Sequence, residues 1–324
     1  MMVTGASGQV GVELVRALRR TLGDASVLAT DLRSPPKGNH PGDEGPSAIV
    51  DCTDRAALDA AAARHRPDTV FHLAAILSAV GEADPERAYR VNMGGLVNVL
   101  ELARETGAGV FVPSSIAVFG PGSPRDPAPQ ECTQRPTTMY GVTKVAGELL
   151  CDYYHRRFGV DARGLRYPGL ISDAPPGGGT TDWAVEIFEA ASEGRGYTCF
   201  LGPDTQLDMM YMEDATRAAM ELMEADPAHL RHRNAYNVTS MQLTPARLAD
   251  ALADRLGAFE IDYEVDPVRQ AIADSWPRRI DDSAARSDWG WKPRFDLHAL
   301  LDAMLPSDGP ARGPSPETTP TPSR

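Results

Sequence analysis

Tyr140 and Lys144 are four residues apart in a Y-x-x-x-K pattern. On a helix this spacing puts the phenol and the ammonium on one face, so the two side chains are neighbours. A free phenol, with a pKa of about 10, is a poor base at neutral pH, and a nearby cation favours the phenolate. The pair therefore predicts that Lys144, together with the positive charge of a bound cofactor, lowers the pKa of Tyr140, which can then remove a proton from a hydroxyl group. The alternative is an ordinary surface Tyr–Lys pair.

A pair of serines, Ser114 and Ser115, follows an apolar run that ends at Pro113, twenty-five residues before Tyr140. The run is typical of a buried strand, and open parallel sheets bind their ligands at the carboxyl ends of strands. A hydroxyl group there can bond to the reacting oxygen and hold it against Tyr140. We expect Ser115 to have this role; a turn-forming serine is the alternative, and it suits Ser114 better.

A glycine-rich loop lies near the N-terminus, where Gly5, Gly8 and Gly11 form G-x-x-G-x-x-G between a short strand and an amphipathic helix. Gly5 can make the tight turn, Gly8 leaves room for a phosphate, and Gly11 lets the helix pack closely on the strand. The free N–H groups of the first helical turn then face a pyrophosphate. The loop predicts a dinucleotide site, with a plain strand-to-helix turn as the alternative.

Acidic residues end the next two predicted strands. Asp31 lies twenty residues beyond Gly11, where a carboxylate accepts hydrogen bonds from ribose hydroxyls and repels a 2′-phosphate, which favours NAD over NADP. Arg33 is the opposing signal, because an arginine here can pair with a 2′-phosphate. Asp51 can reach the adenine amino group or cap the following helix.

The elements that must position these residues alternate in type along the first half of the chain. Short apolar runs predict strands, and longer amphipathic stretches predict helices. Strand followed by helix, repeated, indicates a parallel sheet covered on both faces, and hence an α/β fold. The strands are expected at 27–30, 48–50, 69–73 and 109–113, and the helices at 10–22, 55–64, 85–105 and 140–158.

Composition excludes several classes of protein. The 324 residues carry a net charge of −13, so we expect no nucleic acid partner. No apolar run is long enough for a membrane span, and the N-terminus does not resemble a secretion signal. The four cysteines have no C-x-x-C spacing, which argues against zinc and disulfides and favours a cytoplasmic protein. The Pro/Ser-rich residues 306–324 are expected to be a disordered tail.

The order of the glycine loop, Asp31, the sequence HLAA at 72–75, Ser115 and the Tyr140/Lys144 pair resembles the extended short-chain dehydrogenase/reductase superfamily, over about residues 3–305. Many nucleotide-sugar enzymes of that superfamily read R-x-x-N-x-Y-G-P after the catalytic helix. Here residues 165–172 read LRYPGLIS, without the asparagine. This departure counts against a nucleotide-sugar epimerase or dehydratase, which remains one alternative; a non-catalytic NAD-binding regulator is the other.

The second half is similar to the short-chain type of L-threonine 3-dehydrogenase, on motifs at 177–184, 197–201, 209–214, 275–277, 280–283 and 288–291. The resemblance implies oxidation of the threonine β-hydroxyl by NAD to 2-amino-3-ketobutyrate, without a metal, in a homodimer paired through helices 85–105 and 140–158. It also implies a Rossmann-type doubly wound sheet with a smaller C-terminal substrate-binding lobe. The NAD-binding domain would be 1–170 with 214–240 returning to it, and the lobe 171–213 and 241–305.

Site residues follow from the same resemblance, position by position. Those implied for the cofactor are Gly5, Gly8, Gln9, Val10 and Gly11 at the pyrophosphate, Asp31 and Arg33 at the adenosine ribose, Asp51 and Cys52 at adenine, Leu73, Ala74 and Ala75 along the groove, Tyr140 and Lys144 at the nicotinamide ribose, and Leu170 at the carboxamide. Those implied for the substrate are Ser78, Ser115, Tyr140, Gly179, Thr180 and Thr181.

The hydrogen-bonding groups of the segment Gly177–Thr181 also suit an amino acid substrate, independently of the resemblance. A threonine zwitterion presents a carboxylate, an ammonium and a hydroxyl group, which hydroxyl side chains and glycine N–H groups can satisfy without a large net charge. The segment offers both kinds of group. Further along the chain, Asp214 is expected to cap a helix over 215–224.

Overall fold

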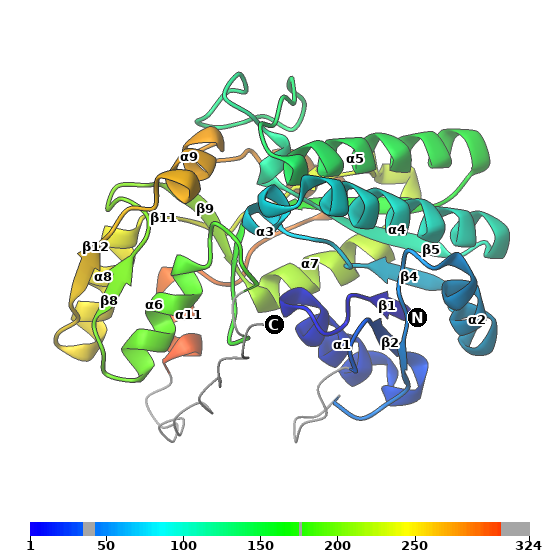
Figure 1. Cartoon of the computed structure of the whole chain (residues 1–324), viewed down its shortest axis with the longest axis horizontal. Helices are drawn as coiled ribbons and strands as arrows, with labels where there is room; N and C mark the ends of the chain where they lie inside the picture. The colour runs from blue at the N-terminus through cyan, green and yellow to red at the C-terminus, as the bar shows by residue number, and fades with distance from the viewer. Residues whose placement is uncertain (35–42, 175–176, 306–324) are drawn as a thin grey trace, which may run out of the picture.

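A seven-stranded parallel sheet forms the larger part of the molecule (Figure 1). The computed structural model describes residues 1–34, 43–174 and 177–305. The strand order is β10-β6-β5-β4-β1-β2-β3, so the order reverses beside β1, where ligands of such sheets bind. The strands are β1 (Met2–Thr4), β2 (Leu28–Asp31), β3 (Ser47–Ile49), β4 (Thr69–His72), β5 (Gly109–Ser115), β6 (Ala162–Tyr167) and β10 (Tyr236–Asn237).

Helices cover both faces of this sheet, because neighbouring residues of each strand point to opposite sides. Val3 packs in one cluster with helices α1 (Gln9–Leu22) and α7 (Met212–Glu224). Met2 packs in another with α2 (Arg55–His65), α4 (Pro85–Thr106) and α5 (Met139–Phe158). The predicted α/β, Rossmann-type fold is confirmed, and the predicted helices of the first half begin and end within one residue of those observed.

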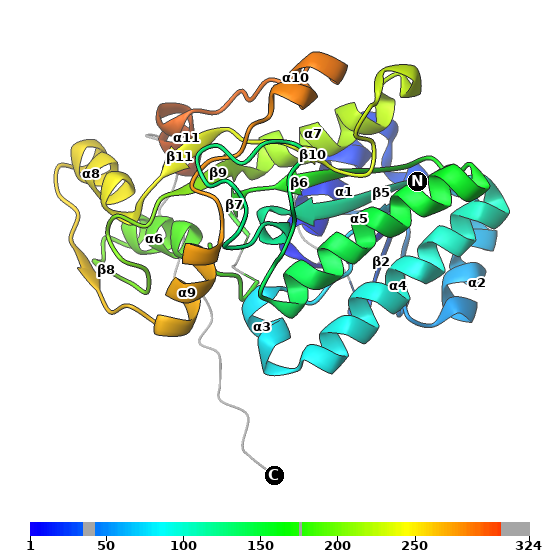
Figure 2. The same ribbon diagram turned by 90° about the horizontal axis from the view of Figure 1, so that it is seen from above.

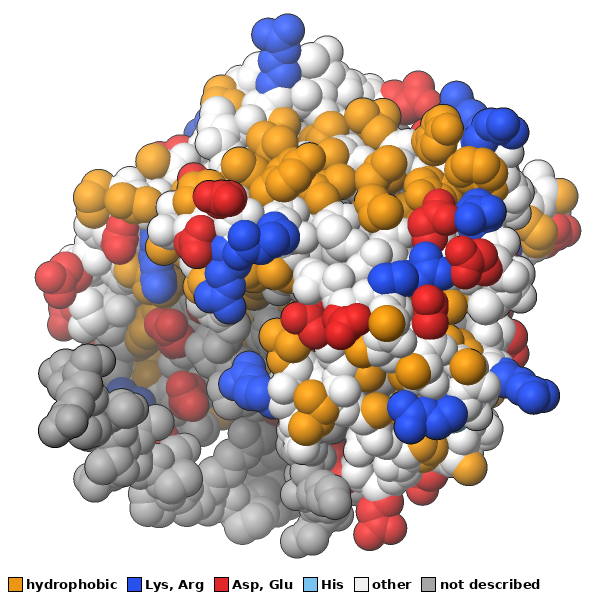
Figure 3. Space-filling view, turned by 45° about the vertical axis from the view of Figure 1, so that its right-hand side comes forward, with side chains coloured by type: hydrophobic (Ala, Val, Ile, Leu, Met, Phe, Trp, Pro, Cys, Tyr) orange, Lys and Arg blue, Asp and Glu red, His pale blue; other side chains and the backbone are white. Residues whose placement is uncertain are grey.

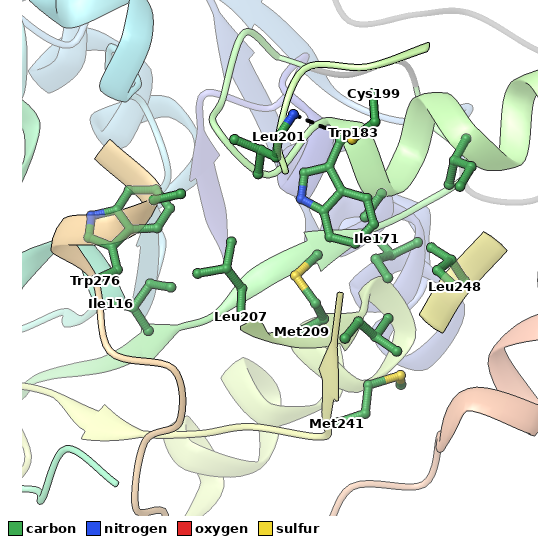
Figure 4. Close-up of a cluster of buried hydrophobic side chains, with 14 of the residues drawn as sticks. Ile116, Ile171, Trp183, Cys199, Leu201, Leu207, Met209, Met241, Leu248 and Trp276 are labelled. Atoms are coloured by element: carbon green, nitrogen blue, oxygen red, sulfur yellow. Dashed lines mark hydrogen bonds between the residues drawn. The ribbon is translucent and has the colours of Figure 1, made fainter. Parts of the chain in front are cut away.

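A smaller unit lies beside the carboxyl end of β5, at the left in Figures 1 and 2. Trp183, Met209 and Leu248 are among its wholly buried side chains, and the close-up in Figure 4 shows them in one apolar cluster. Its elements are β7 (Gly169–Ile171), β9 (Leu207–Tyr211) and β11 (Met241–Leu243) in one sheet, β8 (Tyr197–Cys199) and β12 (Ile261–Tyr263) in another, and the helices α6 (Trp183–Ser192), α8 (Pro245–Leu256), α9 (Pro267–Ser275) and α11 (Leu297–Met304).

The expected extent of this lobe needs one correction. Helix α10 (Ser283–Trp289) falls within the range 241–305 assigned to the lobe, but Ala285 and Trp291 pack in the cluster of α1 and α7, against the large sheet. Ala285 and Trp291 pack there because both side chains are apolar and the chain returns at this point to the face of the large sheet that α1 and α7 cover. The remaining short elements are α3 (Ser78–Ala83) and the 3₁₀ turns η1 (Asp24–Ser26), η2 (Ile116–Val118) and η3 (Pro227–His229). The predicted tail at 306–324 lies outside the described residues.

The expectation that Asp214 caps a helix is wrong. Helix α7 begins three residues earlier than expected, at Met212, and Asp214 lies inside its first turn with no exposed surface. Its carboxylate accepts hydrogen bonds from the backbone N–H groups of Arg294 and Phe295 and pairs with Arg217. The helix begins early because it follows β9 directly. No helix in the described part of the chain is both long enough and apolar enough to cross a membrane.

Candidate active site

A close contact between η2 and α5 brings the predicted catalytic residues together. Ser115 ends β5 and is the N-cap of η2, while Thr138 caps α5 by accepting from the N–H of Gly141 at 3.1 Å. A Cβ added at Gly141 would lie 2.3 Å from the carbonyl oxygen of Ala117, so only glycine permits this approach. Tyr140, the neighbour of that glycine, therefore lies beside Ser115, and the two side chains share a hydrogen bond.

Burial dominates the electrostatics of Tyr140. Burial raises the pKa of Tyr140 to about 12, and the hydrogen bond with Ser115 only partly opposes this. Lys144 lies over the Tyr140 ring, with Nζ 5.4 Å from its centroid, and donates to the carbonyl oxygen of Pro113 at 2.6 Å. Burial also lowers the pKa of Lys144 to about 8. Lys144 does not by itself offset the burial of the phenol, and a lowering of the Tyr140 pKa by Lys144 together with a cationic nicotinamide stays a prediction.

Glu148 continues the same face of α5 one turn beyond Lys144. It is buried, with 4% of its side chain exposed, and accepts two hydrogen bonds from Arg166 at 2.9 and 2.8 Å. It also accepts from Ser114, which makes Ser114 part of the buried network rather than a turn. The charge of Glu148 raises the pKa of Lys144 against desolvation and helps to keep the ammonium protonated. Sequence reasoning missed Glu148, although a further step of four residues was the signal.

The N-terminal glycine loop has the geometry of a dinucleotide cradle. Gly5 has a φ of +71°, and a Cβ at Gly11 would lie 2.1 Å from the carbonyl oxygen of Gly5. Helix α1 starts immediately after Gly8 with no acidic residue in its first turn, so its N-terminus is favourable for an anion. Asp31, at the end of β2, accepts from the N–H groups of Ser7 and Arg33. These residues fit a dinucleotide with its ribose at Asp31.

One large cavity, of about 1160 Å³, joins this loop to the catalytic residues. That volume exceeds the 300–1000 Å³ of common ligand pockets and suits a dinucleotide together with a small substrate. Sixteen of the predicted site residues line it: Gly5, Gly8, Gln9, Val10, Gly11, Arg33, Leu73, Ala75, Ser78, Ser115, Tyr140, Lys144, Leu170, Gly179, Thr180 and Thr181.

Four predicted cofactor residues do not line that cavity. Asp31 lies behind Ser7, and Ala74 lines a small neighbouring cavity that also contains Lys144. Asp51 is exposed and accepts from Thr53. Cys52 is buried against Gly95, and this burial raises the pKa of its thiol to about 11.

Asn92 holds the wall of the groove that follows β4. Its side-chain oxygen accepts from the N–H of Ile76 at 2.8 Å, and its amide group donates to the carbonyl of Ile76 and to the hydroxyl of Thr143. The loop beside Leu73 and Ala75 is thereby tied to α5. Sequence reasoning missed Asn92, because its partners are distant in the sequence.

The end of the cavity that is predicted to hold the substrate has hydroxyl groups in its wall. Thr180 is 1% exposed, and its hydroxyl has no hydrogen-bond partner among the described residues. The N–H groups of Gly178 and Gly179 both donate to the carboxylate of Asp182 at 2.7 Å. The expectation that glycine N–H groups of this segment are free for a substrate is therefore wrong at these two positions. Sequence reasoning also missed Asp182, although it directly follows the Gly-Thr run.

Comparison with known proteins decides the family. A model described as "NAD dependent epimerase/dehydratase family" matches residues 1–239. The chain belongs to this family. The predicted membership of the extended short-chain dehydrogenase/reductases is confirmed at this level.

Individual relatives of this chain match almost its whole length. An uncharacterized epimerase/dehydratase of Staphylococcus saprophyticus is 52% identical over 307 residues, which is 94% of this chain and 95% of that protein. An L-threonine dehydrogenase of Clostridium difficile is 48% identical with a TM-score of 0.91, covering 94% of this chain and 95% of that chain. A GalE-like L-threonine dehydrogenase of Cupriavidus necator, solved in a holo form, is 49% identical with a TM-score of 0.90, covering 94% and 98%.

The described residues contain no group of three or more His, Cys, Asp or Glu side chains arranged as metal ligands. A metal-independent reaction stays a prediction from the sequence.

Proposed function

We propose that this protein oxidises the β-hydroxyl of L-threonine to 2-amino-3-ketobutyrate, with NAD as the oxidant. One observation carries the proposal: the buried hydroxyl of Thr180, which has no hydrogen-bond partner among the described residues, belongs to a side chain that lines the same cavity as Ser115, Tyr140 and Lys144. Hydroxyl groups at this end of the cavity suit a free amino acid rather than an apolar ligand. The L-threonine dehydrogenases among the solved relatives support the same substrate.

NAD, when bound, accepts a hydride and adds positive charge close to the reacting carbon. The N-terminus of α1, with Gly8, Gln9 and Val10, would hold its pyrophosphate. Asp31 would accept from the adenosine ribose, since a carboxylate retains acceptor sites beyond its two bonds to backbone N–H groups. Leu170 and Leu73 would border the nicotinamide end of the cavity.

Oxidation of an alcohol removes a proton from oxygen and a hydride from the adjacent carbon, and this chain's residues handle the proton. Ser115 would bond to the substrate hydroxyl and hold it against Tyr140. The Tyr140 oxygen would take the proton as the C–O bond becomes a double bond. Because burial keeps the phenol protonated, Tyr140 needs cationic charge beyond that of Lys144 to act at neutral pH. Thr180 and Thr181 would orient the charged groups of the amino acid.

The direct test is the absorbance of NADH when the protein, NAD and L-threonine are mixed. UDP- and GDP-sugars are incubated in parallel and their products are separated by chromatography, because an epimerase or dehydratase returns the hydride to the sugar and accumulates no NADH. We expect NADH to form with threonine and the nucleotide sugars to remain unchanged. Tyr140→Phe should bind NAD as the wild type does and lose about 10²- to 10⁴-fold in turnover. Turnover of a nucleotide sugar in place of threonine would contradict the proposed substrate, and an active Tyr140→Phe would contradict the assigned base.

We also propose a homodimer formed through α4 and α5. Figure 3 shows hydrophobic side chains gathered across the upper part of one face, where these two helices lie in Figure 1. Apolar side chains exposed over these helices are typical of an interface. They include Tyr89 and Val97 of α4 and Val142, Leu149, Tyr153 and Phe158 of α5.

A charge placed in this face tests the dimer. Leu149 is 62% exposed, so Leu149→Asp should leave the monomer folded and should abolish the dimer in analytical ultracentrifugation. Leu256→Asp, a change at an exposed leucine of α8, is the matched control and should stay dimeric. A wild-type protein that sediments as a monomer would contradict the proposal.

A further inference from the structure

The loop before α6 is folded around one carboxylate. Oδ2 of Asp182 accepts from the N–H groups of Gly178 and Gly179, both at 2.7 Å, and the Asp182 side chain is buried. A Cβ added at Gly179 would lie 3.0 Å from the other oxygen, Oδ1. Gly178 has a φ of +86°, a conformation that glycine adopts without strain. The loop is therefore closed tightly over the carboxylate.

Two neighbouring elements hold this closed loop in place. On one side, a Cβ at Gly177 would lie 3.0 Å from Leu77, and one at Gly178 would lie 2.9 Å from Val80 of α3. On the other side, the Asp182 carbonyl accepts from the N–H groups of Val185 and Glu186 in α6, whose Trp183 is wholly buried in the lobe core (Figure 4). Asp182 thus connects a rigid core to a loop that packs on α3.

The residues between the glycines and Asp182 are the two threonines proposed to meet the substrate. Thr180 and Thr181 line the cavity that contains Tyr140, and the Thr180 hydroxyl is buried without a partner in the described residues. A buried hydroxyl without a bond costs free energy unless a ligand satisfies it. The direction of that hydroxyl depends on the loop, and the loop depends on the two bonds to Asp182.

We propose that Asp182 is a positioning residue for the oxidation of threonine: by gathering the Gly178 and Gly179 amides, it fixes Thr180 and Thr181 in the orientation that binds the amino acid. This inference rests on the proposed function and adds a residue to its site. Charge-assisted bonds from a carboxylate to N–H groups are among the stronger hydrogen bonds in proteins. Two of them on one buried oxygen favour a single loop conformation over many.

The test compares Asp182→Ala with Asp182→Asn. The alanine variant loses both bonds, so the KM for threonine should rise by about tenfold or more while the Kd for NAD stays within about twofold. Asparagine keeps a carbonyl oxygen that can accept both N–H groups, so the KM of this variant for threonine should return close to the wild-type value. Glu186→Gln, which removes a carboxylate from the first turn of α6 without a bond to the loop, is the matched control and should behave as wild type.

A second measurement separates this inference from the proposed substrate. Amide hydrogen exchange at Gly178 and Gly179 should be faster in Asp182→Ala than in the wild type, with or without threonine turnover. If the wild type makes no NADH from threonine, the proposed function fails, and unchanged exchange at the two glycines then overturns the loop role as well.

Two kinetic outcomes would overturn the positioning role directly. An asparagine variant as defective as the alanine variant would mean that the negative charge itself binds the substrate ammonium. A parallel loss of NAD affinity would mean that the change disturbs the whole structure rather than the loop.

Discussion

The molecule has two glycine-rich loops that border one cavity, and they use their backbone N–H groups differently. In the loop of Gly5, Gly8 and Gly11, the glycines let a helix approach a strand and leave the N-terminus of α1 open to an anion. In the loop of Gly178 and Gly179, both N–H groups are already bonded to Asp182. The first loop is suited to bind a phosphate with its backbone, whereas the second is suited to orient side chains.

The difference teaches that glycine content alone does not define a loop's role. In each loop a carboxylate accepts backbone N–H groups, Asp31 in the first and Asp182 in the second. Asp31 lies at the edge of its loop and takes the N–H of Ser7, whereas Asp182 is enclosed by its loop. The position of the acid, more than the number of glycines, decides which groups remain for a ligand.

The largest expected effect is at the first loop. A Cβ at Gly11 would lie 2.1 Å from a backbone oxygen, which cannot move as a flexible side chain can. Gly11→Ala should therefore cost about 1–3 kcal/mol in the loop's geometry, or about tenfold to hundredfold in NAD affinity by calorimetry. Gly122→Ala, where a Cβ would meet nothing within 4 Å, is the control and should bind NAD normally. Equal NAD affinity in both variants would contradict the contrast between the loops.

The second effect concerns Lys144, in the cavity that both loops share. Its pKa is about 8 in the fold and about 10.4 in an unfolded chain. Between these values the unfolded chain binds more protons, so the free energy of unfolding should rise with pH, by about 2 kcal/mol relative to Lys144→Met. Thermal unfolding of both proteins from pH 7 to pH 10 measures this difference. A difference that stays constant with pH would show that Lys144 is not desolvated.

The smallest expected effect concerns Thr180 in the second loop. Thr180→Val removes a buried hydroxyl that has no partner in the described residues, so the free energy of unfolding should rise by about 1 kcal/mol while the KM for threonine increases by about fivefold. Thr216→Val is the control, because the Thr216 hydroxyl donates to the carbonyl of Glu213 and its loss should destabilise α7. If Thr180→Val lowers the free energy of unfolding, the Thr180 hydroxyl of the wild type has a hydrogen-bond partner in the fold and is not available to a ligand.

The parts of this molecule that the sequence predicts well are those governed by local periodicity. The helix expected over 140–158 runs from Met139 to Phe158, and the glycine spacing located the cradle at α1, because both depend on neighbours within a few residues. The Tyr140–Lys144 pair is also local, and its spacing on one helix face is observed.

What the sequence did not predict depends on distant parts of the chain or on solvent exclusion. The pKa of Tyr140 rises because surrounding residues bury it, which the Y-x-x-x-K pattern does not encode. Asp214 looked like a cap because its partners, Arg294 and Phe295, are about eighty residues away. The bonds of Asp182 are local, yet the same sequence is also compatible with an open loop. The closed conformation depends on packing against α3, which the sequence does not reveal.

The enclosed carboxylate of Asp214 has a consequence for the order of assembly during synthesis. It has no exposed surface, and two of its backbone donors, Arg294 and Phe295, are translated about eighty residues after it. A chain that stops before Arg294 lacks these two donors, although Arg217 and Ser240 can still bond to the carboxylate. The hydrogen bonding of Asp214 is therefore complete only when the segment of Arg294 and Phe295 is in place.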